Sequence, residues 1–144
     1  MKSKFTFISI LAAAAVFAAS WAMAHQKNSN EETTKLLQRQ SLPDVIGKQV
    51  IFAEVSYKPG QASTPHRHPG SVLAYVIEGE IISQLEGQPA VTYKVGQSWY
   101  EPPNVPHLVS KNASSKRPAR LLAWLILDEG GVPKESLEKI ATPS

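Results

Sequence analysis

The chain has 144 residues, with 15 Lys and Arg against 12 Asp and Glu, and a formal net charge of +3 at pH 7. This length suits one domain with a modest core, and the near balance of charge, without a basic stripe between aromatic residues, argues against a nucleic-acid partner. The absence of cysteine excludes disulfides, thiolate zinc sites and thiol nucleophiles.

Residues 1–24 are predicted to be a secretory signal peptide. Lys2 and Lys4 form a basic start, an apolar run follows from Phe5 to Ala19, and Ala22-Met23-Ala24 has the small-x-small form of a cleavage site. The apolar run is short for a membrane span, which needs about 20 residues. We therefore expect cleavage after Ala24, a nearly neutral mature chain that is periplasmic or secreted, and no stable membrane anchor after cleavage.

The rest of the chain consists of short apolar runs separated by Gly, Pro and polar turn residues, a pattern typical of an all-β sandwich or barrel. Thr33 to Leu42 fits either a short helix or a first strand, and Pro133 to Ile140 fits a short C-terminal helix. Glu78-Gly79 separates two runs and predicts a tight hairpin, in which Gly79 supplies a positive φ. Strands are expected at residues 48–58, 72–77, 80–85, 90–94, 97–101, 108–111 and 119–127.

The last of these strands is apolar on both faces. Alternate residues of a strand point to opposite sides of a sheet, so one half of Leu121 to Leu127 can fill a barrel while the other half needs a cover. We expect a homodimer that buries this outer face. Residues 33–42 of the same chain are the alternative cover.

Three of the four histidines lie in two short segments of the chain. His66 and His68 are two residues apart, and on a strand they would turn two imidazoles toward the same face. His107 can add a third imidazole from a neighbouring strand, and imidazole suits Zn, Cu, Fe and Ni. The sequence therefore predicts a metal site inside a β-barrel. Arg67, which alternates with the histidines, is expected to face outward.

The first histidine segment resembles the first conserved motif of the cupin superfamily, G-x5-H-x-H-x3,4-E-x6-G. Gly60, His66, His68 and Gly79 match this motif. Val72 stands where the family places a metal-binding glutamate. The resemblance therefore implies the histidine ligands of the family without its usual carboxylate ligand.

The second segment resembles the second cupin motif, G-x5-P-x-G-x2-H-x3-N. Gly96, Pro102 and His107 match it, Asn104 replaces the last glycine, and Asn112 lies one residue late. The order and spacing of the two motifs identify the chain as a small single-domain cupin of the type-2 conserved barrel.

The resemblance implies a fold and a division of the chain. The fold is a jelly-roll β-barrel, also described as a double-stranded β-helix, with the site in its interior. The barrel would span residues 48–128, between an N-terminal arm at 25–47 and a C-terminal tail at 129–144. The implied ligands of a divalent ion (Fe, Mn, Ni, Zn or Cu) are His66, His68 and His107.

Three interpretations of the missing glutamate are open. The three histidines bind the metal alone, or Gln84 or Glu101 supplies a fourth ligand, or the site no longer binds metal tightly. Glu101 is also a candidate catalytic base, because burial among apolar residues would raise the pKa of its carboxyl toward neutrality. Trp99 lies two residues before Glu101, so both side chains would point to the same face of the strand. Trp99 is expected either to form an aromatic wall of the pocket or to pack in the core.

Two classes of function follow from these expectations. Three neutral imidazoles leave the full +2 charge on a divalent ion, which favours small anionic or enolisable substrates that chelate it. The first class is therefore a metal-dependent enzyme, a dioxygenase of the quercetinase-like kind or an isomerase-like relative. The second class is a non-catalytic cupin that binds a small molecule or a metal in the periplasm.

Overall fold

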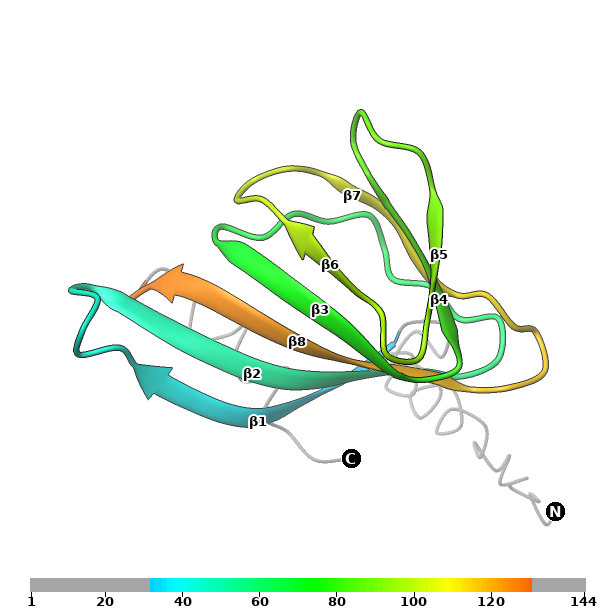
Figure 1. The fold of residues 1–144 in the computed structure, drawn as a ribbon, viewed down its shortest axis with the longest axis horizontal. Helices are drawn as coiled ribbons and strands as arrows, with labels where there is room; N and C mark the ends of the chain where they lie inside the picture. Colours follow the sequence, from blue (N-terminus) through cyan, green and yellow to red (C-terminus); the bar gives the residue numbers. More distant parts are fainter. Residues whose placement is uncertain (1–31, 131–144) are drawn as a thin grey trace, which may run out of the picture.

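The computed structural model describes residues 32–130 (Figure 1). The expected signal peptide and its cleavage site lie outside the described residues, as does the helix expected at Pro133 to Ile140. Within residues 32–130 no helix is long and apolar enough to cross a membrane. The elements of this part are the strands β1 (Thr33–Ser41), β2 (Lys48–Tyr57), β3 (Ser71–Glu78), β4 (Glu80–Leu85), β5 (Val91–Lys94), β6 (Ser98–Glu101), β7 (His107–Asn112) and β8 (Ala119–Asp128).

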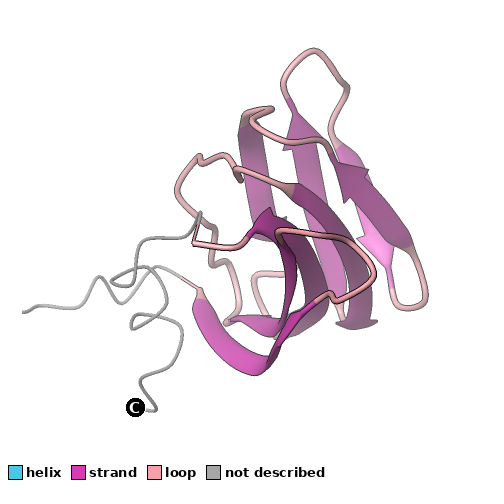
Figure 2. Cartoon of the chain, turned by 90° about the vertical axis from the view of Figure 1, so that its left-hand side faces the viewer, coloured by secondary structure: helices cyan, strands magenta, loops and turns pink. Residues whose placement is uncertain are grey.

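The strands form two antiparallel sheets, as the all-β prediction requires. One sheet has five strands in the order β1-β2-β8-β3-β6, and the other has three in the order β5-β4-β7. Figure 2 shows the two sheets as separate layers on either side of the interior. The expected jelly-roll architecture is therefore confirmed, and seven of the eight strands lie within a residue or two of their predicted positions.

Residues 33–42 adopt the strand alternative rather than the helix. β1 pairs with β2 from Thr33 opposite Ser56 to Ser41 opposite Gln49, with an irregularity between Leu36 and Gln38. Much of the segment expected as an N-terminal arm is thus the edge of the larger sheet. Because β1 lies beside β2 and not over it, it does not cover the outer face of β8.

The hairpin predicted at Glu78-Gly79 is wrong. β3 pairs with β6 and β8, whereas β4 pairs with β5 and β7, so the two strands belong to different sheets. Gly79 does have the expected positive φ of 68°. A Cβ atom at Gly79 would lie 2.6 Å from the carbonyl oxygen of Pro118, so this glycine lets the chain cross closely from one sheet to the other.

Alternation along the central strands of the larger sheet separates an inner from an outer face. On β8, Leu121 and Ala123 are buried inside, while Trp124 and Ile126 are exposed outside. Phe52 of β2 stacks on Trp124 with the ring centroids 4.2 Å apart. We refer to the outward apolar side chains of this sheet as the outer apolar face: Val50, Phe52, Leu73, Tyr75, Tyr100, Leu122, Trp124 and Ile126.

Candidate metal centre

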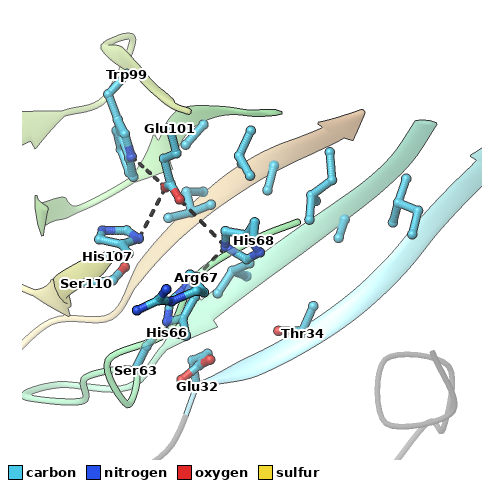
Figure 3. A pocket seen from close by; sticks show the side chains of 18 of the residues that line it. Glu32, Thr34, Ser63, His66, Arg67, His68, Trp99, Glu101, His107 and Ser110 are labelled. Carbon is cyan, nitrogen blue, oxygen red and sulfur yellow. Dashed lines mark hydrogen bonds and ion pairs between the residues drawn. The ribbon is translucent and has the colours of Figure 1, made fainter. Parts of the chain in front are cut away.

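The inner face of the larger sheet and the loop between β2 and β3 line a cavity of about 330 Å³ (Figure 3). Most of its lining residues are apolar. Five of the six candidate site residues inferred from sequence line this cavity: His66, His68, Trp99, Glu101 and His107.

A backbone bridge brings the two histidine segments together. The amide of His107 donates to the carbonyl of His66 at 2.7 Å, and the amide of His66 donates to the carbonyl of His107 at 3.2 Å. The amide of Asn104 donates to the carbonyl of His68 at 2.7 Å. Asn104 has a positive φ of 61°, a conformation that asparagine tolerates better than most residues, which explains how it replaces the glycine of the motif.

The expectation that His66 and His68 share a strand is wrong, but their rings do meet. Both residues lie in the loop between β2 and β3, where His66 forms an isolated bridge. His66 Nδ1 donates to the carbonyl of Thr64 at 2.8 Å, because a carbonyl oxygen can only accept. In the neutral imidazole this bond leaves Nε2 of His66 as an acceptor, so Nε2 of His68 is the donor in the 3.1 Å hydrogen bond between the two rings.

His68 is uncharged at neutral pH. Burial lowers the pKa of its imidazole from 6.5 to about 4, and the neighbouring His66 and His107 add to this effect although Glu101 opposes it. A metal binds the neutral form of imidazole, so this environment prepares His68 to be a ligand.

His107 is only 3% exposed and contacts a polar group at each ring nitrogen. Nε2 lies 2.8 Å from the hydroxyl oxygen of Ser83. Nδ1 lies 3.3 Å from Oε1 of Glu101, but within the described part of the chain this buried atom has no hydrogen-bond partner. An unsatisfied buried nitrogen beside a carboxylate is costly, and a cation between the two would remove that cost.

Glu101 is 4% exposed and carries a carboxylate that points into the cavity. Trp99 Nε1 donates to Oε1 at 2.8 Å, while Oε2 lies 3.6 Å from Nε2 of His68. The ring of Trp99 stacks on Tyr93 with the centroids 4.6 Å apart. This stacking holds the indole ring so that its Nε1 points to the carboxylate of Glu101. Trp99 is thus both a cavity wall and a partner of the carboxylate.

The expectation that the pKa of Glu101 is raised is wrong. Burial alone would raise it, but the contacts with His107, Trp99 and His68 together outweigh burial and hold the pKa below its ordinary value of 4.5. The carboxylate is therefore an anion at neutral pH. An anion of this kind suits a metal ligand better than a catalytic base, whose pKa should lie near the working pH.

The sheet register explains why a glutamate occurs at position 101. Val72 of β3 and Glu101 of β6 are direct partners in the antiparallel pair, and both side chains face the cavity. Direct cross-strand neighbours have Cβ atoms about 4.5–5.5 Å apart. Glu101 therefore places a carboxylate beside the position at which the first motif normally carries one.

The donor set fits a divalent ion in type and spacing. Two ligands at about 2.0–2.1 Å from a tetrahedral ion are about 3.3 Å apart. The closest donor separations here are 3.1 Å for His66 to His68, 3.6 Å for His68 to Glu101 and 3.3 Å for His107 to Glu101. The rings of His66 and His107 also lie near each other, with centroids 5.2 Å apart, but no group of three His, Asp or Glu side chains in residues 32–130 is arranged to hold a metal ion. Binding of an ion would therefore require a change in the positions of these side chains.

Gln84, in contrast, is not among the residues that line the cavity. Its amide donates to the carbonyl of Gln88 at 3.2 Å, and its strand β4 pairs with β5 and β7 rather than with the strand of Val72. Alternation along β4 turns Ser83 inward instead. A polar residue at an inward position, between Ile81 and Leu85, was the sequence signal that would have identified Ser83.

Other polar groups of the cavity were missed from sequence. Arg67 is exposed, as expected, but it also lines the cavity, because its segment is a loop and not a strand. The hydroxyl of Tyr57 lies 2.7 Å from that of Ser63 and 2.9 Å from that of Ser110, and all three residues line the cavity. These hydroxyls come from three separate segments, so no local motif marks them.

Ser83, His107 and Glu101 follow one another in the order of a hydrolytic triad. The serine contacts one imidazole nitrogen, and the carboxylate lies beside the other. Ser83 is 4% exposed, however, and is not among the residues that line the cavity. A nucleophile must reach its substrate, so this arrangement supports orientation of His107 and not hydrolysis.

Several solved structures share the fold. A cupin domain from Bordetella pertussis Tohama I is 20% identical, with a TM-score of 0.50 over 67% of this chain and 93% of that chain. An RmlC-like cupin protein from Desulfovibrio desulfuricans is 17% identical, with a TM-score of 0.51 over 76% of this chain and 95% of that chain. An oxalate oxidase in complex with the substrate analogue glycolate is 16% identical, with a TM-score of 0.55 over 78% of this chain and 66% of that chain. At these identities the likeness concerns the fold alone.

The family comparison is more specific than the structural one. No curated protein matches the chain significantly. The family model of the cupin domain matches residues 53–125, from within β2 to within β8. This range includes both histidine segments, the crossing at Gly79 and the pairing of Val72 with Glu101. The chain belongs to the cupin family.

Proposed function

We propose that this chain is an exported cupin that binds a divalent metal ion through His66, His68, His107 and Glu101. In this proposal it acts on a small anionic or enolisable molecule, in a dioxygenase reaction of the quercetinase-like kind. The observation that carries the proposal is the buried carboxylate of Glu101, directly opposite Val72 and next to two histidines. A buried charge is costly and is retained where it is paired or coordinates a metal.

A divalent ion at this cluster would supply a Lewis acid and a template for an anionic oxygen donor. The protein would supply orientation and electrostatics. Thr64 fixes the proton of His66 on Nδ1, burial keeps His68 neutral, and Trp99 occupies one oxygen of Glu101 so that the other faces His68. One carboxylate and three neutral imidazoles would leave the ion a net charge of +1, which still favours an anionic substrate.

The alternative is a non-catalytic cupin that binds a small molecule or a metal. The observation in its favour is that the donor side chains contact one another, while no three His, Asp or Glu side chains of residues 32–130 are arranged to hold a metal ion. The two proposals differ in whether a metal ion is required. The enzyme needs the ion for catalysis, whereas the binding protein can bind a small molecule without it.

Metal uptake by untagged protein tests the proposal. We expect one ion per chain by elemental analysis after exposure to Fe, Mn, Ni, Zn and Cu in turn, and oxygen consumption with enolisable substrates such as flavonols. His68→Ala should lower metal affinity by about 100-fold, since it removes a direct ligand. Gln84→Ala is the matched control and should bind like the wild type. A wild-type protein that takes up none of these metals would refute the metal-dependent enzyme and leave the binding protein.

We also propose that two copies pair through the outer apolar face. This face is flanked by ion pairs, Lys48 with Asp128 at one end and Arg120 with Glu54 and Glu78 at the other. A contiguous apolar patch with a charged rim is the usual composition of a protein interface.

Light scattering of the protein at micromolar concentration should therefore give the mass of a dimer. Leu73→Glu should convert the dimer to a folded monomer, because Leu73 is 49% exposed in the single chain and its replacement removes no core contact. Leu108→Glu is the control, since Leu108 is 40% exposed on the smaller sheet. A monomeric wild type, or a Leu73→Glu protein that remains dimeric, would contradict this arrangement.

A further inference from the structure

The inner face of the larger sheet contains a row of three alanines across neighbouring strands. Ala74 of β3, Ala123 of β8 and Ala53 of β2 are successive partners in the strand register. Trp99 of β6 is the next partner of Ala74 and closes one end of the row. All four residues line the cavity. We refer to the three alanines as the alanine row.

Larger side chains stand on both sides of the alanine row. On one side, Val72, Leu125 and Ile51 are successive partners. On the other side, Leu121 lies opposite Val55. Inward residues of a strand are about 6.6–6.8 Å apart along it, so a row of methyl groups between two such rows forms an apolar trough across the sheet. The trough belongs to the cavity of about 330 Å³, a volume at the lower end of the range for small-molecule sites.

The histidine cluster and Glu101 lie at the β6 end of this trough, whereas Thr34, the strand partner of Val55, lines the cavity at the β1 end together with the preceding Glu32. Glu101 extends the row of Val72 and Leu125, so the carboxylate stands one row away from the alanines. Figure 3 shows the labelled histidines, Arg67 and Glu101 together, while side chains drawn only in carbon continue along β8 and β2. The trough is therefore apolar between Thr34 at one end and the histidine cluster, which we call its polar end, at the other.

Arg67 gives this polar end a cation of its own. It is the only Arg or Lys among the residues that line the cavity. Within the described part of the chain, no hydrogen bond or ion pair joins its guanidinium to another residue. A guanidinium without a protein partner can bind a carboxylate or an enolate oxygen with two parallel hydrogen bonds.

We propose that the ligand of this cavity is a small amphipathic anion. Its apolar ring or short alkyl chain lies in the trough over the alanine row, and its anionic oxygens face Arg67 and the histidine cluster. This inference rests on the proposed function for the head group, but the preference for an apolar body does not depend on the metal. Compact polar anions and sugars would leave the trough unfilled or place hydroxyls where the alanine row offers no hydrogen-bond partner.

Calorimetric titration with three probes tests this inference on both zinc-loaded and metal-free protein. Phenylacetate has an apolar body and an anionic head, glycolate has the head with a hydroxyl, and phenylacetamide has the body without the charge. We expect phenylacetate to bind at least ten-fold more tightly than either of the others. Ala123→Leu, which fills the trough, should abolish the advantage over glycolate while metal content and glycolate binding stay unchanged. Arg67→Gln should abolish the advantage over phenylacetamide.

Further measurements keep the test decisive. If Ala123→Leu does not fold, the smaller change Ala53→Val and a series from propionate to hexanoate on the wild type replace it. Equal binding of glycolate and phenylacetate, affinity that does not rise with alkyl length, or no binding of any probe would overturn the inference. Failure of the proposed function is distinguishable, because it appears as absent metal uptake, while the preference for phenylacetate over glycolate persists in metal-free protein.

Discussion

Glu101→Val should lower the affinity for the divalent ion by about 100-fold, a change of about 2.7 kcal/mol in binding free energy. The variant removes the buried carboxylate that lies 3.6 Å from His68 and 3.3 Å from His107. Adding Val72→Glu to this variant should restore most of the affinity, because positions 72 and 101 are direct partners and face the same cavity. Metal affinity is measured by competition with a chelator of known strength.

The single variants separate charge from position. Val72→Glu alone should not bind the ion much more tightly, because two adjacent carboxylates repel each other and one of them takes up a proton. Glu101→Gln keeps the side-chain shape and an acceptor for Trp99 but removes the charge, so it should resemble Glu101→Val in metal affinity. Glu86→Val changes an exposed glutamate and serves as the control. A Glu101→Val protein with wild-type affinity would show that the histidines bind the metal without a carboxylate.

Lowering the pH from 7 to 4.5 should lower the free energy of unfolding of the metal-free protein by about 2 to 3 kcal/mol. The pKa of His68 is about 4 in the folded protein, against 6.5 for the ordinary imidazole. Because the folded value is the lower one, the unfolded chain binds the extra proton between these pH values. Stability is therefore complete above pH 6.5 and is lost as the pH falls toward 4.

Urea unfolding at a series of pH values checks this expectation against His68→Gln, which cannot take up the proton. The variant should show a pH dependence that is flatter than the wild type by the contribution of His68. The range stops at pH 4.5 because the lowered pKa of Glu101 adds a second loss of stability below that value. Parallel curves for the two proteins would mean that His68 is solvated and titrates normally.

Short-range sequence signals determined the fold class and most of the candidate site. The alternation of apolar and polar residues and the Gly and Pro turns are local properties of the chain, so they were sufficient to predict the strands. The bounds of β4 were predicted without error. The motif spacing indicated that His66, His68 and His107 are neighbours in the fold, as their ring contacts show, and the missing glutamate directed attention to Glu101. These inferences needed only residue identity and distance along the chain.

Only the tertiary structure decided which strands pair and what they enclose. The alternation around Glu78-Gly79 is the same whether β3 and β4 form a hairpin or enter different sheets, because a turn fixes local direction and not the partner of each strand. The same long-range pairing places Glu101 opposite Val72 and assembles the alanine row from three strands. It also reverses the expected shift of the Glu101 pKa, because burial was foreseeable from sequence whereas the contacts with Trp99, His107 and His68 depend on how distant segments pack.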